Sequence, residues 1–243
     1  MKNSNVSIYQ SAILFVIIIF ALNITSCVPE ERLVTEREDF TLDLPDFSMV
    51  TLDFPAKVVI YKGTEQAIKI NAQPEIFDAM TKTVTNGEWL IDLANFRGGF
   101  ESVTIEITIP FITGLHATST GDISVQDYFE GTNLLDLRVE STGNIDYQGT
   151  VQQINLLIDG TGDVNLAGNT TILNARLSST GDLSAYGLST EEVDLVSTST
   201  GDAEIRVEKM LTVTMTSTGD VKYKGNPQII SSISGTGDLK DEN

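Results

Sequence analysis

A four-residue motif that returns seven times constrains the fold of this chain more than any other feature. The motif reads Ser-Thr-Gly-Asp, with Gly in the first place of two copies and Asn in the last place of one. The copies occupy residues 119–122, 141–144, 160–163, 179–182, 199–202, 217–220 and 235–238. Successive motif glycines are 22, 19, 19, 20, 18 and 18 residues apart. A nearly fixed period of this size is typical of a solenoid, in which each repeat stacks on its neighbours.

Apolar and polar residues alternate on both sides of each motif glycine. Leu135, Leu137 and Val139 precede Gly143 at every second position, and Ile145 continues the pattern after it. A period of two indicates strands with one buried face, because a helix could not hold these residues on one side. The sequence therefore predicts an all-β fold, a parallel, right-handed β-helix or solenoid of about seven rungs with a spacing of about 4.8 Å. We expect one internal row to contain Leu137, Leu156, Leu177, Leu195 and Val213.

The motif glycine has a structural interpretation. Glycine adopts a positive φ at a bend where other residues are strained, and an Asp or Asn beside it can bond the local backbone. We therefore predict a structural repeat corner at each motif glycine. These are Gly121, Gly143, Gly162, Gly181, Gly201, Gly219 and Gly237.

The motif acid has a second, functional interpretation as a cation ladder, with calcium as the only cofactor considered. Stacked carboxylates about 4.8 Å apart would repel one another by about 0.9 kcal/mol per pair even in water, and a cation would relieve this repulsion. Asn144 replaces the acid in one rung, which favours backbone bonding over metal binding. The ladder residues would be Asp122, Asp163, Asp182, Asp202, Asp220 and Asp238.

Residues 1–27 are predicted to be a lipoprotein signal peptide. An apolar run at 12–22 follows Lys2, and it is shorter than the roughly 20 residues that a membrane-spanning helix needs. The following Ile-Thr-Ser-Cys resembles a bacterial lipobox, and this resemblance implies cleavage before Cys27 and lipid, such as palmitate, on Cys27. The alternative is an ordinary signal peptide with an unmodified cysteine nearby. Cys27 is the only cysteine, so neither an intrachain disulfide nor a cysteine metal site can form.

The remaining chain divides into three parts. Residues 28–39 are polar and predict a flexible tether, residues 40–110 predict a β-rich N-terminal cap region, and residues 111–243 carry the β-solenoid repeats. Strands are predicted at 47–53, 56–61, 67–71, 88–93 and 102–109, with one helical turn at 74–80 begun by its proline. Asn-Gly at 86–87 predicts a hairpin turn, and Trp89 is expected in the core. The charges at 239–243 discourage another chain from adding a strand.

Charge and the single histidine limit the function classes. The formal net charge is −19, so the chain repels phosphate backbones and nucleic acid is not an expected partner. His116 is the only histidine, and its outward, exposed position in the first rung indicates no catalytic role. The repeated threonines of the motif could form an ice-binding array, but charged neighbours such as Glu140 and Asp159 interrupt it.

One enzymatic alternative is a polysaccharide lyase or hydrolase, because pectin-degrading enzymes also use parallel β-helices. Acids and arginines that could lie side by side on adjacent rungs are Asp136, Arg138, Glu140, Asp159 and Arg176. Alternating charges on an exposed sheet are more often cross-strand pairs, and a shared fold does not carry a function. We therefore assign no catalytic residue.

Residues 103–109 and the run Pro-Phe-Ile-Thr-Gly-Leu at 110–115, leading into 119–123, resemble the autotransporter-adhesin head domain, also called the head GIN domain. The strand at 56–63, the Asn-Gly hairpin and the closing segment 233–239 are similar too, so the resemblance covers about residues 45–240. It implies a β-helical, exported protein or lipoprotein of Bacteroidetes, with no established activity and no catalytic residues to transfer.

The sequence thus favours a non-enzymatic, adhesin-like lipoprotein of the cell envelope. We expect it to be exported, anchored by lipid to the outer membrane at the cell surface or periplasmic face, and to present its solenoid to a glycan or protein partner. The alternatives are a structural envelope protein without a ligand and the polysaccharide-degrading enzyme. No oligomeric state follows from the sequence.

Overall fold

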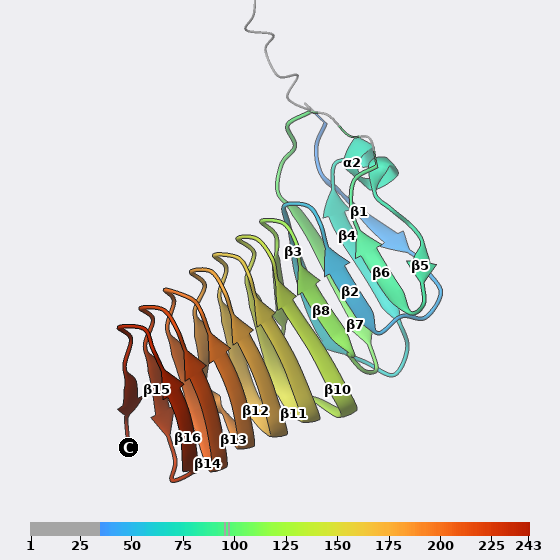
Figure 1. The fold of residues 1–243 in the computed structure, drawn as a ribbon. Coiled ribbons are helices and arrows are strands. Elements are labelled where there is room, and N and C mark those ends of the chain that lie inside the picture. Colours follow the sequence, from blue (N-terminus) through green and yellow to red (C-terminus); the bar gives the residue numbers. More distant parts are fainter. Residues whose placement is uncertain (1–34, 95, 97) are drawn as a thin grey trace, which may run out of the picture.

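The repeats form long strands that stack in parallel along one axis. The computed structural model describes residues 35–94, 96 and 98–243. The predicted signal peptide with Cys27, and the tether up to residue 34, lie outside these residues. The strands of the repeats are β8 (Gly114–Ala117), β9 (Asp122–Val125), β10 (Phe129–Val139), β11 (Ile145–Ile158), β12 (Val164–Leu177), β13 (Leu183–Ser197), β14 (Ala203–Met215), β15 (Val221–Lys224), β16 (Gln228–Ile233) and β17 (Leu239–Asp241). They confirm the predicted parallel β-solenoid of about seven turns (Figure 1).

The N-terminal part of the described chain is also built mainly of strands. Its elements are β1 (Glu38–Leu42), β2 (Met49–Leu52), β3 (Ala56–Lys62), β4 (Ala67–Ala72), α2 (Pro74–Ala79), β5 (Val84–Thr85), β6 (Glu88–Ile91) and β7 (Val103–Ile109). The predicted helical turn and hairpin are confirmed. Asn86 and Gly87 have φ values of 53° and 78°, and they join antiparallel β5 and β6. Glu38 and Asp39, at the end of the range predicted as a tether, lie in β1.

The strands make two faces of one coiled sheet. Face A contains β6, β2, β8, β10, the second halves of β11 to β14, and β16, all in parallel. Face B contains β7, β3, β9, the first halves of β11 to β14, then β15 and β17, also in parallel. Antiparallel β4 and β1 close face B at the N-terminal end, and β5 closes face A there. Long strands such as β11 bend between the faces and serve both.

The order of the strands in space differs from their order in the chain. The pair β2 and β3 comes before all other parallel strands in the chain, but it lies between β6 and β7 on one side and β8 and β9 on the other. Parallel pairing therefore continues without a break across residue 110. The buried row on face A runs from Trp89 through Val50 and Leu115 to Leu137, so Trp89, which is fully buried, belongs to the same core as the repeats.

The interior consists of aliphatic rows that run along the axis. Leu137, Leu156, Leu195 and Val213 lie in one row, as predicted, but Ala175 fills the position between Leu156 and Leu195. The prediction for Leu177 was wrong, because this residue lies two positions further along β12, in the neighbouring row with Val139 and Ile158. The rows are nearly free of solvent exposure, which makes hydrophobic burial between rungs the main stabilising term.

The motif glycines lie at the turns between the two faces, but their role differs from the predicted one. Positive φ values occur at other glycines, namely Gly87, Gly131, Gly168 and Gly225. A methyl group on Gly143 would instead overlap the carbonyl oxygen of Gly121 in the preceding rung, and one on Gly162 would overlap that of Gly143. The same conflict recurs up to Gly237. Glycine is needed because the backbones of neighbouring rungs approach too closely for a Cβ atom.

No helix in the described part of the chain is long and apolar enough to span a membrane.

Replacing Gly162 with Ala should destabilise the solenoid, because the new methyl group must push two rungs apart. Forcing extra volume into a packed site costs about 1–3 kcal/mol, which lowers the Tm by about 2–4 °C per kcal/mol in a domain of this size. Thermal unfolding followed by circular dichroism measures the change. Gly99→Ala is the matched control, because no atom of the described residues lies within 4 Å of a Cβ at Gly99. Equal Tm values for both variants would contradict the close-approach role.

Candidate functional site

A groove lies on the outer side of face A in the repeats. It has a volume of about 610 Å³ and crosses β10, β11, β12 and β13. Two columns of outward side chains line it, because residues in register on parallel strands point the same way. The first column is Asp136, Asn155, Asn174 and Asp194. The second column is Arg138, Leu157, Arg176 and Val196. We call this site the lateral groove.

A network of charged groups lies at the N-terminal end of the lateral groove. Arg138 Nε donates to Asp136 Oδ1 at 2.8 Å, and His116 Nε2 lies 3.2 Å from the same oxygen. On its other side, His116 Nδ1 lies 3.3 Å from Thr51 Oγ1. Burial alone would raise the pKa of Asp136, but the hydrogen bonds and charges of Arg138 and His116 outweigh burial and hold this pKa below its ordinary value. Asp136 is therefore an ionised, fixed acceptor.

His116 differs from its prediction in exposure. It does occupy an outward position in β8, next to Arg138 in the register. However, its side chain is only 13% exposed, because it is enclosed between Thr51 of β2 and Asp136 of β10. The local sequence around His116 does not indicate that β2 packs beside β8, so the prediction of an exposed side chain was wrong. His116 thus positions Asp136 at the edge of the lateral groove.

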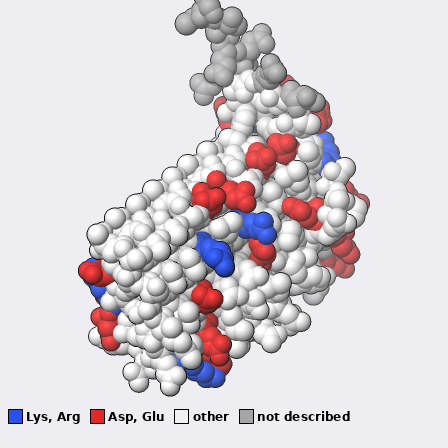
Figure 2. All heavy atoms as spheres, in the orientation of Figure 1, with Lys and Arg blue, Asp and Glu red and all other residues white. Residues whose placement is uncertain are grey.

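The centre of the lateral groove alternates charged, amide and apolar groups. Asn155 Oδ1 accepts hydrogen bonds from Asn174 Nδ2 at 3.0 Å and from Gln153 Nε2 at 2.9 Å, which fixes the orientation of the Asn155 amide. Arg176 has no carboxylate within ion-pair distance in the described chain. Leu157 lies between Arg138 and Arg176 in the register. In Figure 2, basic groups lie near the middle of the view, with acidic groups close beside them.

The structure separates the residues of the enzymatic alternative. Asp136, Arg138 and Arg176 line the lateral groove, whereas Glu140 and Asp159 do not. Asp159 belongs to a column nearer the turn, where its Oδ1 accepts a hydrogen bond from Ser178 Oγ at 2.5 Å. The two acids are therefore not arranged with Asp136 around one reacting position.

The motif acids form a continuous hydrogen-bonded ladder that runs from rung to rung, along the corner between the two faces of the solenoid. From Asp122 to Asp220, each Oδ1 accepts from the backbone N–H of the motif acid or Asn in the next rung, at 2.7–2.9 Å, and Asn144 takes part in the same way. The predicted bond to the local backbone is thus a bond between rungs. The members in chain order are Asp122, Asn144, Asp163, Asp182, Asp202, Asp220 and Asp238.

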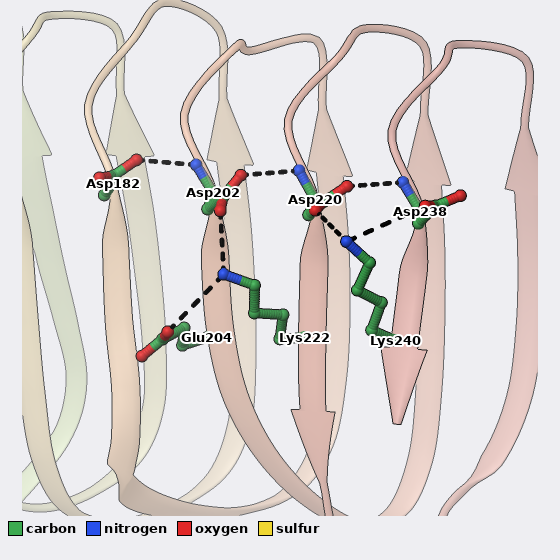
Figure 3. A network of polar contacts seen from close by, with 7 residues as sticks. All are labelled: Asp182, Asp202, Glu204, Asp220, Lys222, Asp238 and Lys240. Atoms are coloured by element: carbon green, nitrogen blue, oxygen red, sulfur yellow. Dashed lines mark hydrogen bonds and ion pairs between the residues drawn. The ribbon is translucent and has the colours of Figure 1, made fainter. Parts of the chain in front are cut away.

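Two lysines bind the second carboxylate oxygens near the C-terminal end of this ladder (Figure 3). Lys222 Nζ lies 3.0 Å from Asp202 Oδ2 and 4.0 Å from Glu204 Oε1, and Lys240 Nζ bonds Asp220 Oδ2. The hydrogen bond from Lys240, helped by the N–H of Asp238, holds the pKa of Asp220 below its ordinary value. Within the described residues, no group of three or more His, Cys, Asp and Glu side chains is arranged to hold a metal ion.

Sequence reasoning missed several of these residues. Asn155, Asn174 and Asp194 stand at the same place in their repeats as Asp136, so aligning the outward positions of the repeats would have found them. The partners of the ladder could not be found in this way, because Lys222 and Lys240 occur only in the last two repeats.

The fold and the lateral groove define this chain as a β-solenoid protein with a polar lateral surface. It belongs to the family described as "Putative auto-transporter adhesin, head GIN domain", whose model matches residues 46–227. The family predicted from the sequence is therefore confirmed. No curated protein matches the sequence.

Solved structures share the fold over nearly their full lengths. A "putative adhesin" from Bacteroides fragilis is 21% identical, with a TM-score of 0.81, and the match covers 87% of this chain and 99% of that one. A "putative adhesin" from Parabacteroides merdae is 16% identical, with a TM-score of 0.70 and coverage of 87% and 98%. A "Putative lipid binding protein" from Parabacteroides distasonis is 14% identical, with a TM-score of 0.65 and coverage of 88% and 100%. At these identities the likeness shows the fold alone.

The ladder predicts different effects on stability for two substitutions at Asp182. Asp182→Ala removes the acceptor for the N–H of Asp202 and should cost about 1 kcal/mol of stability. Asp182→Asn keeps an acceptor oxygen, as Asn144 does, and should leave the stability unchanged within about 0.5 kcal/mol. Urea denaturation of the two variants and the native chain measures the difference.

A calcium titration of the native chain distinguishes the two interpretations of the ladder. If the carboxylates serve the backbone, millimolar calcium leaves the Tm unchanged. A calcium-dependent rise in Tm that Asp182→Asn abolishes would instead assign a cation site.

Proposed function

We propose that this protein is a non-enzymatic, adhesin-like lipoprotein of the cell envelope whose lateral groove binds an acidic glycan. In this proposal the chain is exported, and lipid on Cys27 holds it to the outer membrane with the solenoid facing away from the cell. The family description and the names of the first two structural neighbours support an adhesin-like role. The signal-like segment and the lipobox resemblance support export and anchoring.

The chemistry of the lateral groove supports a glycan as the ligand. Amides and carboxylates in the first column can bond sugar hydroxyls as donors and acceptors, and Leu157 offers an apolar surface for a sugar ring. The column from Asp136 to Asp194 spans three rung spacings, about 14 Å. A linear polymer that lies along it would meet similar groups at every rung, so several weak contacts add.

The proposal that the ligand is acidic rests on Arg176. Arg138 is neutralised by Asp136, whereas Arg176 in the same column has no ion pair within the described chain. A guanidinium binds a carboxylate or sulfate through two parallel hydrogen bonds. In a chain with a net charge of −19, an unpaired arginine inside a polar groove is therefore the best local attraction for an anionic sugar.

Binding suits the lateral groove better than catalysis. A general base at neutral pH works best with a pKa near 7, whereas Arg138 and His116 hold the pKa of Asp136 below its ordinary value. Glu140 and Asp159 lie outside the lining of the lateral groove. Asp194 lies within it, but three rung spacings, about 14 Å, separate it from Asp136, which exceeds the roughly 5–9.5 Å between the paired carboxylates of glycosidases.

Replacing Arg176 with Ala should weaken binding of acidic glycans about tenfold or more, because one charge-assisted contact of about 1.5–3 kcal/mol is lost. The measurement is binding of the purified protein to an array of neutral, carboxylated and sulfated glycans, followed by titration of the best probe. Arg206→Ala is the matched control. Arg206 carries the same charge but lies on face B, where its strand neighbours in the register are Ser189 and Lys224.

Three other outcomes would contradict this proposal. Equal loss with Arg206→Ala would show a general charge effect and contradict the role of the groove. A blank array with the folded native chain would reject the glycan and favour a protein partner or a structural envelope role. Cleavage of a polyuronate by the native chain would establish the enzymatic alternative.

The proposed anchor predicts that Cys27→Ser abolishes incorporation of labelled palmitate and releases the protein from the membrane fraction.

The proposed surface location predicts that protease treatment of intact cells degrades the solenoid of the native protein. Protection in intact cells, with degradation only after lysis, would place the solenoid in the periplasm and contradict surface adhesion.

A further inference from the structure

The last rung leaves part of the hydrophobic interior exposed. Ile229 and Ile233 of β16 continue the buried rows of Leu211 and Met215, yet they are 41% and 44% exposed, and Ile230 on the outer side is 61% exposed. Leu211 and Met215, one rung earlier, are almost fully buried. Within the described chain, no strand pairs with the outer edge of β16.

The free edge of β16 presents backbone hydrogen-bonding groups as well as apolar side chains. Ser234 donates its N–H to the carbonyl of Met215 at 2.9 Å, so this residue faces β14. Neighbouring residues in a parallel strand point their backbone groups to opposite sides. The N–H and C=O groups of Ile229, Ser231 and Ile233 therefore face the open edge, which is a template for another strand.

The inward side chains of β16 read the same in both directions. They are Ile229, Ser231 and Ile233, so Ser231 is the centre of the pattern. In an antiparallel pair related by a twofold axis through Ser231, Ile229 would lie opposite Ile233 of the other copy. Ser231 would lie opposite itself. This register keeps inward residues on one face and uses the backbone groups that point to the open edge.

Charge also favours a second copy at this place. From residue 221 onward the chain carries three lysines and three acids, so the net charge of −19 resides entirely in the rest of the chain. The charges at 239–243, predicted to discourage strand addition, lie in and after β17 on face B, whereas β16 has no charged residue. Two acidic molecules therefore repel each other least when they meet at this end.

We propose that β16 is a self-pairing surface that joins two copies of this chain end to end. The pairing is antiparallel about Ser231, and it makes the cores of the two solenoids continuous. Only a closed dimer forms, because β1, β4 and β5 cover the opposite end of the solenoid. The first described residues lie at that covered end (Figure 1), so in the dimer the first described residues of the two copies lie at opposite ends. If the chain is anchored as proposed above, this dimer links molecules on facing membranes.

The test is the mass of the purified chain by sedimentation and by light scattering across a concentration series. The native chain should reach twice the monomer mass. Ser231→Pro should remain a monomer, because proline removes the central N–H of the open edge without removing a bond to β14. Ile229→Lys should also remain a monomer, because it places a charge in the seam between the copies.

Leu134→Lys is the matched control, since Leu134 is 47% exposed on the outer side of β10, far from β16. It should dimerise like the native chain, and circular dichroism should show native strand content in all variants. A native chain that stays monomeric, or a dimer that both β16 variants retain, would overturn the proposal. The outcome is independent of glycan binding, because Arg176→Ala leaves β16 unchanged and should still dimerise.

Discussion

The close approach of backbones at the motif glycines is the constraint on which the rest of this structure depends. From Gly143 to Gly237, each motif glycine packs against the carbonyl oxygen of the motif glycine one rung earlier. This contact allows neighbouring rungs to keep the same register even though the repeats vary in length from 18 to 22 residues. A constant register stacks like residues, which produces the internal aliphatic rows, the acid ladder and the two columns of the lateral groove.

The acid ladder explains how a strongly acidic chain tolerates a column of stacked carboxylates. Every carboxylate before the last one receives a backbone N–H from the next rung, and Lys222 and Lys240 neutralise two members near the C-terminal end. Hydrogen bonds to the ionised form stabilise the charge where the repulsion would be greatest. The same rule operates in the lateral groove, where Arg138 and His116 surround Asp136.

Local sequence signals predicted those features that a single repeat determines. Period-two alternation gave the strands and the inward residues, Asn86 and Gly87 gave the hairpin, and Pro74 gave the start of α2. The reason for the motif glycines was missed, because the distance to a neighbouring rung depends on the stack and not on the repeat itself. The sequence predicted only part of the lining of the lateral groove, because it pointed to Asp136, Arg138 and Arg176 but not to the amides beside them. The enclosure of His116 depends on β2, which is far away in the sequence.

The position of β2 and β3 has a consequence for the biogenesis of this molecule. Ser48 and Thr113, whose side chains bond each other beside β2 and β8, are 65 residues apart, and β6 lies along the other edge of β2. A chain that emerges N-terminus first cannot wind up turn by turn from its beginning, because its earliest turn is held between two later ones. Closing that long loop has an entropic cost that is met before the first stacked contacts form, so folding starts late. If the chain is exported as proposed, this delay would keep it unfolded while it crosses the membrane.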